Sequence, residues 1–222
     1  KYADAIEWTY YNALLGAMRP DGSNWAKYTP LFGQKLPGSE QCGMGLNCCN
    51  ANGPRGLFTI PLTTVMSSDE GLNVNFYIEG SYQTTSPQKN LITVKQHSDY
   101  PVSGTVNISL EMKTPEKMTL ALRIPSWSDR STVLINDKPV EKVMKGEYLK
   151  INRTWKDSDK IQIEFEMKGK LHYMSQNPAS VAVTRGPIVL TRDERLIGPK
   201  LEAVIAPMKD ENGFIHLTPQ KK

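Results

Sequence analysis

The sequence has few of the residues that build disulfide frameworks or membrane spans. Its 222 residues include only three cysteines, and this odd number does not suit a disulfide framework. The longest apolar runs, such as 181–183 and 188–190, fall far short of the roughly 20 residues that a membrane-spanning helix needs. We therefore expect no membrane span and no membrane partner.

The sequence also lacks a strong excess of charge of one sign. Its 27 basic and 23 acidic residues give a formal net charge of +4, and apart from the two final lysines they are interspersed along the chain. Proteins that bind nucleic acids usually gather their basic residues on one face. The pattern indicates a solvated surface, and we expect no nucleic-acid partner.

The first residues lack both an initiator methionine and the basic-then-apolar pattern of a signal peptide. From Tyr2 to Met18, apolar residues recur at spacings of three and four, which predicts a buried helix that ends before Pro20. No comparable helix follows, so we expect its packing partners to precede Lys1 in a longer protein. The localisation stays open, since a signal for the periplasm or for secretion would also lie upstream.

The rest of the chain is rich in short segments that alternate apolar and polar residues between turn-forming residues. This pattern, without intervening helices, predicts a mainly β fold with an antiparallel β-sandwich. The boundary lies near residue 68, so that residues 1–67 form one part and 68–222 the sandwich domain. The expected strands cover 72–78, 91–95, 105–112, 118–124, 132–135, 147–151, 160–167, 181–184 and 187–191, with edge strands at 201–205 and 214–217.

All three cysteines lie in the glycine- and asparagine-rich segment 42–55, as Cys42, Cys48 and Cys49. Together with Glu40 they could bind zinc, which favours thiolates and takes four ligands in structural sites. They could also be buried, unreactive thiols, or a vicinal pair that is oxidised reversibly. Residues 52–54 resemble a helix start, and residues 55–66 fit either a helix interrupted at Pro61 or a strand.

Several motifs together resemble a known family of enzymes. They are Cys48-Cys49-Asn50-Ala51-Asn52-Gly53-Pro54-Arg55, Tyr11-Asn12-Ala13-Leu14-Leu15, Leu120-Ala121-Leu122-Arg123-Ile124-Pro125-Ser126-Trp127 and Thr184-Arg185-Gly186-Pro187. In sequence and order they are similar to glycoside hydrolase family 127 and the related family 146, the β-L-arabinofuranosidases. The resemblance covers nearly the whole chain, and the vicinal cysteines are its most specific part.

The resemblance implies a retaining hydrolase that acts on an arabinose-containing glycan with a zinc-bound cysteine as nucleophile. Cys48 would be the nucleophile and a zinc ligand, and Cys49 a second ligand. The family's other ligands, a glutamate and a cysteine two residues apart, and its acid/base glutamate come from an α-helical (α/α) barrel that would precede Lys1. Residues 1–67 would then be a helix and a loop of that barrel, and the isolated chain would be inactive.

Other residues have weaker claims to a function. Glu40 and Cys42 share the spacing of the family's missing ligand pair but lie elsewhere in its order, so we expect Cys42 to pack beneath the loop. Trp25, Trp127 and Trp155 could stack on a sugar ring, although tryptophans in a sandwich are more often core. The alternative function is a carbohydrate-binding or architectural sandwich with inert cysteines, and a third is a redox-sensing loop.

Overall fold

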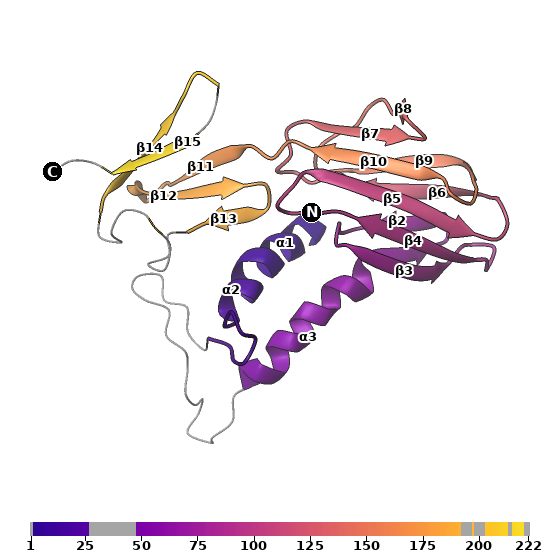
Figure 1. The fold of residues 1–222 in the computed structure, drawn as a ribbon, viewed down its shortest axis with the longest axis horizontal. Helices are drawn as coiled ribbons and strands as arrows, with labels where there is room; N and C mark the ends of the chain where they lie inside the picture. Colours follow the sequence, from indigo (N-terminus) through magenta and orange to yellow (C-terminus); the bar gives the residue numbers. More distant parts are fainter. Residues whose placement is uncertain (1, 27–47, 192–196, 198–202, 213–214, 220–222) are drawn as a thin grey trace.

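The computed structural model describes residues 2–26, 48–191, 197, 203–212 and 215–219. Its strands form a β-sandwich, with the helices packed beside it and a smaller sheet next to the first helices (Figure 1). The helical elements are α1 (Tyr2–Trp8), the π-helix η1 (Thr9–Leu14), α2 (Leu15–Ala17) and α3 (Cys48–Thr63). The predicted fold class, mainly β with an antiparallel sandwich after a helical segment, is confirmed.

The two layers of the sandwich are a four-stranded and a six-stranded sheet. The first has the order β1 (Val65–Ser68), β2 (Gly71–Val74), β6 (Glu116–Arg123) and β9 (Tyr148–Trp155). The second has the order β3 (Gly80–Thr85), β4 (Leu91–His97), β5 (Thr105–Met112), β10 (Lys160–Phe165), β7 (Ser131–Ile135) and β8 (Lys138–Pro139). Neighbouring strands in both sheets are antiparallel, except that β2 pairs with β6 in parallel.

The alternation of residues along each strand separates the core from the solvent. In β5, Val106, Ile108 and Leu110 are buried while Asn107 is exposed, because successive side chains of a strand point to opposite faces. Leu120 and Leu122 of β6 face them from the other sheet as members of one hydrophobic cluster. The core is therefore built from the two inner faces, and the outer face of the six-stranded sheet is left to polar side chains.

Two smaller sheets complete the described chain. β11 (Gly169–Met174), β12 (Asn177–Arg185) and β13 (Ile188–Leu190) form an antiparallel sheet, and β14 (Ile205–Lys209) pairs with β15 (Ile215–Pro219). Figure 1 shows the three-stranded sheet beside α1 and α2, with the two-stranded sheet beyond it.

The structure corrects several predicted boundaries. The strand expected over 72–78 ends at Val74, and β3, β8 and β11 were not predicted. β3 carries one large inward-facing side chain, Tyr82, among Ser, Gln and Thr residues, so its apolar alternation is too weak to recognise. Part of the edge strand expected over 201–205, and residue 214 of the other, lie outside the described residues.

The helix start expected at residues 52–54 was wrong. The described part of α3 begins at Cys48 and runs to Thr63, with Pro54 and Pro61 inside it. A proline removes one backbone donor from the helical ladder, and flanking turns can still hold the helix where packing favours it. Residues 48–55 are thus helical rather than the loop that the glycine and asparagine content indicated, and residues 55–66 combine the end of this helix with the start of β1.

Candidate functional site

The vicinal cysteines lie in the first described turn of α3. Cys48 is exposed and Cys49 is half-buried, so the sulfur of Cys48 is the more accessible to a reactant. Cys42 and Glu40 lie outside the described residues, and the expectations for them stay open. The structure therefore places the predicted nucleophile on a helix, where its position depends on how α3 packs.

Two glycines set how closely α3 approaches the N-terminal helices. A Cβ atom on Gly53 would lie 2.3 Å from Cε2 of Trp25, and one on Gly56 would lie 3.0 Å from Cδ2 of Leu14. Since residues three apart share a helix face, both glycines form one flat strip against which Trp25 and Leu14 pack. This contact holds the first turns of α3, and with them Cys48 and Cys49, against the chain around η1 and α2.

The described residues do not complete a metal site. Within the described ranges, no group of three or more His, Cys, Asp or Glu side chains is arranged to hold a metal ion. The histidines instead contact separate neighbours: His97 lies 3.2 Å from Glu79, His172 lies 2.9 Å from the Thr184 hydroxyl, and His216 lies 2.8 Å from Asp210.

The two thiols are nevertheless suitable donors for zinc. Zinc prefers thiolate and imidazole ligands and takes four in a structural site, so Cys48 and Cys49 could supply two positions. The remaining ligands would have to come from residues outside the described ranges. The donor chemistry thus fits zinc in kind, and the described chain contributes half of the expected number.

A buried polar cluster that the sequence did not reveal joins α1 to the sandwich. Glu7, which is 1% exposed, accepts hydrogen bonds from the Tyr100 hydroxyl at 2.5 Å, from Trp127 Nε1 at 2.9 Å and from the Arg123 guanidinium. Arg123 also donates to Asp4 at 2.6 Å and to the Asn75 carbonyl. We call these residues, Asp4, Glu7, Tyr100, Arg123 and Trp127, the Glu7 cluster.

The electrostatics of the Glu7 cluster are those of a structural ion pair. Burial on its own lowers the pKa of Arg123, but the adjacent Glu7 carboxylate raises it, and the net result lies above the usual value. Burial raises the pKa of Tyr100 well above its usual value, and the charge of Glu7 raises it further. Arg123 therefore stays charged and Tyr100 neutral, and burial separates the Glu7 carboxyl group from the solvent.

A second contact joins the helices to the three-stranded sheet. In η1, the side-chain amide of Asn12 donates to the Pro187 carbonyl at 2.8 Å and accepts from the Val189 backbone N–H at 2.7 Å. The Asn12 side chain thus bonds backbone groups of the β12–β13 hairpin in the way that a neighbouring strand would. This contact brings together two of the sequence motifs, the one around Asn12 and Thr184-Arg185-Gly186-Pro187. Asn12 and Pro187, which share the hydrogen bond, are 175 residues apart in the chain.

The tryptophans that could have bound a sugar belong to the interior. Trp25, Trp127 and Trp155 are 4%, 7% and 0% exposed. Their ring faces are covered by protein, so the core interpretation is confirmed for all three.

The helices leave an apolar surface open. A groove of about 460 Å³ between α1, η1 and α3 is lined mainly by apolar side chains, among them Ile6, Leu14 and Ile60. Phe58 and Leu62, on α3, are 68% and 79% exposed. Exposed apolar patches of this kind mark surfaces that another segment or protein covers. None of the described helices is both long enough and apolar enough to cross a membrane.

Comparisons with known proteins agree on one family. Residues 71–167 match the family described as "Beta-L-arabinofuranosidase, GH127 middle domain". Ara127N, a GH127 β-L-arabinofuranosidase from Geobacillus stearothermophilus T6, superposes with a TM-score of 0.80 at 26% identity, over 95% of this chain and 37% of that one. No curated protein matches the sequence significantly.

Two further solved structures have the same fold. One, described as a glycoside hydrolase, has a TM-score of 0.79 at 25% identity, and the superposition covers 97% of this chain and 39% of the other. The other, a GH127 β-arabinofuranosidase, has a TM-score of 0.74 at 21% identity, over 98% and 41% of the two chains. The chain thus spans about two fifths of the length of the solved structures that it matches.

Proposed function

Because residues 71–167 match the GH127 middle domain, we propose that this chain is part of a retaining hydrolase of arabinofuranosides with Cys48 as nucleophile. The observation that carries the proposal is the match of residues 71–167 to the family, together with the superposition on Ara127N over 95% of the chain. The glycan substrate and the cysteine chemistry are inferred from the resemblance of the motifs around Cys48.

The reaction would proceed in two displacements. The thiolate of Cys48 attacks the anomeric carbon; a carbon–sulfur bond forms as the glycosidic carbon–oxygen bond breaks, and the leaving oxygen takes a proton from a carboxylic acid. Water then attacks the same carbon, gives its proton to the carboxylate, and the thiolate leaves. Two displacements at one carbon retain its configuration, as in other glycosidases with a covalent intermediate.

The exposure of Cys48 and the burial of its neighbour suit these roles. Cys48 is accessible to a sugar, whereas the half-buried Cys49 is better suited to a ligand than to an attacking group. Both sulfurs would bind zinc, which when bound keeps coordinating thiols deprotonated at neutral pH. The helix α3 supplies the rigid support that a nucleophile needs.

The acid and the remaining ligands would come from the helical barrel that the family places before these residues. The open groove beside Ile6 and the exposed Phe58 and Leu62 support this, since they form an apolar surface suited to further helices. We propose that α1, η1, α2 and α3 are elements of that barrel, and that residues 68–222 form a separate sandwich domain.

Substitution of each cysteine in the longer enzyme tests the proposal. We expect Cys48→Ser to abolish turnover and lower bound zinc, and Cys49→Ser to lower both, as measured by metal analysis and by arabinofuranoside hydrolysis. Cys42→Ser is the matched control and should leave both unchanged. The proposal fails if neither Cys48→Ser nor Cys49→Ser lowers zinc content or turnover.

A further inference from the structure

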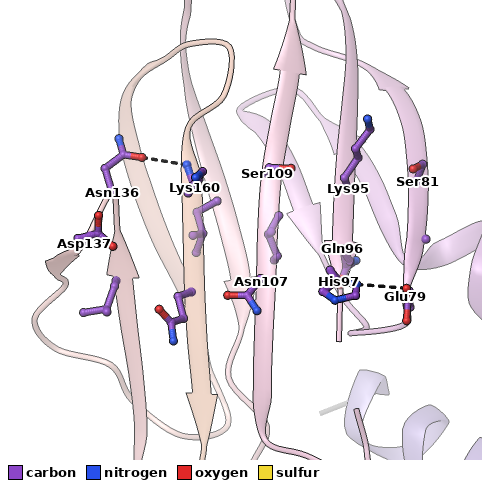
Figure 2. Close-up of a pocket in the computed structure, with 15 residues that line it drawn as sticks. Glu79, Ser81, Lys95, Gln96, His97, Asn107, Ser109, Asn136, Asp137 and Lys160 are labelled. Carbon is purple, nitrogen blue, oxygen red and sulfur yellow. Dashed lines mark hydrogen bonds and ion pairs between the residues drawn. The ribbon is translucent and has the colours of Figure 1, made fainter. Parts of the chain in front are cut away.

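The outer face of the six-stranded sheet carries a hollow that the cysteines do not border. Its volume is about 580 Å³, and it extends across β3, β4, β5, β10 and the end of β7 (Figure 2). The hollow lies on the face opposite the hydrophobic core, since the exposed members of the alternating strands border it, namely Lys95, His97, Asn107, Lys160 and Gln162.

Strand register arranges the side chains of the hollow in two transverse rows. The first row is Lys95, Ser109 and Lys160, which are direct partners across β4, β5 and β10. The second row, two residues along, is His97, Asn107 and Gln162. Figure 2 shows Lys95, Ser109 and Lys160 side by side on neighbouring strands. With strands about 4.8 Å apart, each row extends on the order of 10 Å.

Of the charged side chains that line the hollow, Lys95 and Glu79 already have a partner, whereas Lys160 and Asp137 form no ion pair within the described part of the chain. Lys95 Nζ lies 2.5 Å from Glu111, and His97 Nδ1 lies 3.2 Å from Glu79. By contrast, the side-chain amides of Asn107 and Gln162 have no hydrogen-bond partner within the described part of the chain, and both are exposed. The groups left for a ligand are amides, hydroxyls and one charge of each sign, on Lys160 and Asp137.

These groups favour a neutral ligand that is rich in hydroxyls. A side-chain amide both donates and accepts hydrogen bonds and can contact two neighbouring hydroxyls of a sugar, and serine hydroxyls do the same. The ion pair of Lys95 with Glu111 and the opposite charges of Lys160 and Asp137 reduce the attraction for a polyanion, and an apolar ligand would leave the amides and hydroxyls of the hollow without hydrogen-bond partners. We propose that the hollow is a non-catalytic binding site for a neutral oligosaccharide.

The proposal goes beyond the hydrolase function and does not depend on the role of Cys48. Apart from the imidazole of His97, the described side chains that line the hollow include no aromatic ring. Without stacking on a ring, the affinity depends on hydrogen bonds, and we expect a dissociation constant on the order of 1 mM. Such a site would keep the enzyme near a glycan and would raise the local substrate concentration.

Titration of the 222-residue chain tests the inference. Arabinotriose, xylotriose and trigalacturonic acid serve as probes, followed by NMR chemical shifts. We expect saturable binding of at least one neutral trisaccharide, with the largest shifts on β4, β5 and β10. The double variant Asn107→Ala/Gln162→Ala should raise the dissociation constant about tenfold. Its melting temperature should match that of the wild type, because both side chains are exposed.

The matched control is Gln83→Ala, an exposed glutamine on β3 that faces the same side outside the hollow. It should leave binding unchanged. The inference is overturned if no neutral probe binds, if only trigalacturonic acid binds, or if the double variant binds as the wild type does. Binding of xylotriose without arabinotriose would still support the site and would leave the arabinofuranoside substrate to the test with the cysteine variants, so the two proposals fail separately.

Discussion

At the scale of single residues, Glu7 contributes more to the stability of the fold than its sequence context suggests. Glu7 lies in α1 between Ile6 and Trp8, yet its carboxylate accepts three hydrogen bonds. The donors are Arg123 of β6, Trp127 in the loop after β6, and Tyr100. Removing one partner of a buried ion pair leaves an uncompensated charge, which costs roughly 3–5 kcal/mol. The stability of the chain therefore depends on a carboxylate that plays no part in the proposed chemistry.

Glu7→Gln is expected to lower the free energy of unfolding by about 3 kcal/mol, since the neutral amide leaves the charge of Arg123 balanced by Asp4 alone. Urea denaturation measures the change. Glu111→Gln is the control, because Glu111 pairs with Lys95 on the exposed sheet face and such pairs contribute less than about 1 kcal/mol. Equal losses in the two variants would contradict the assigned role of Glu7.

Asp129 gives the chain a dependence of stability on acid pH. Hydrogen bonds from Lys145 and Lys170 lower the pKa of Asp129 to about 2, from an ordinary value of 3.8. A carboxylate with a depressed folded-state pKa stabilises the fold fully above its unfolded-state pKa, and this contribution is lost as pH falls through the folded value. The affected window therefore lies between about pH 4 and pH 2.

Asp129→Asn should reduce stability slightly above pH 4 and should have no effect near pH 2. The Asp129 side chain is 44% exposed, so solvent screening limits the difference to under about 1 kcal/mol. Thermal denaturation of both proteins across this range measures it. If the difference in stability between Asp129→Asn and the wild type stayed constant down to pH 2, the lowered pKa of Asp129 would not be its cause.

At the scale of elements, α3 depends on glycines that a helix ordinarily disfavours. Glycine in a helix interior costs about 1 kcal/mol relative to alanine, and α3 also contains two prolines. The strip formed by Gly53 and Gly56 offsets this cost because it allows Trp25 and Leu14 to pack directly against the helix backbone. The helix that carries the cysteines is thus stabilised by tertiary packing more than by its own propensity.

Gly53→Ala should destabilise the chain by about 1–3 kcal/mol, since its Cβ would overlap the ring of buried Trp25. Chemical denaturation measures the effect, and tryptophan fluorescence should report displacement of the Trp25 ring. Asn52→Ala is the matched control at an exposed position of the same helix and should be neutral or stabilising. If Gly53→Ala behaved like Asn52→Ala, the close packing would be refuted.

At the scale of the whole molecule, contacts join the helices both to the sandwich and to the three-stranded sheet. The Glu7 cluster joins α1 to the loops and strand ends of the sandwich, and Asn12 joins η1 to the β12–β13 hairpin. The division into residues 1–67 and 68–222 stays a prediction. These contacts fix the orientation of the helices against the sandwich, and therefore also the position of Cys48.

The isolated 222-residue chain should not hydrolyse arabinofuranosides, although it is expected to fold. It spans about two fifths of its solved relatives, and its described residues offer no complete group of metal ligands. A chromogenic arabinofuranoside measures the activity, with the longer enzyme as the positive control. Turnover by the isolated chain that Cys48→Ser abolishes would show that no further domain is needed.

Much of this protein follows from the sequence alone, because the relevant signals are local. Period-two alternation predicted the sandwich strands from 91 onwards except the two-residue β8, and the turn at Asn136 and Asp137 has the positive φ angles that a two-residue hairpin needs. The vicinal cysteines and the order of the motifs indicated a resemblance to glycoside hydrolase family 127, and the comparisons find the same resemblance. Residue type and spacing suffice for such features.

Only the tertiary structure showed the helical state of Cys48, the Glu7 cluster and the hollow beside Asn107. Glu7 and Arg123 are 116 residues apart, and nothing in either local pattern shows that one will neutralise the other. The two rows of the hollow depend on the pairing of three strands, which periodicity does not specify. Local sequence determines which elements form, whereas long-range packing decides which polar groups meet in the core and which are left for a ligand.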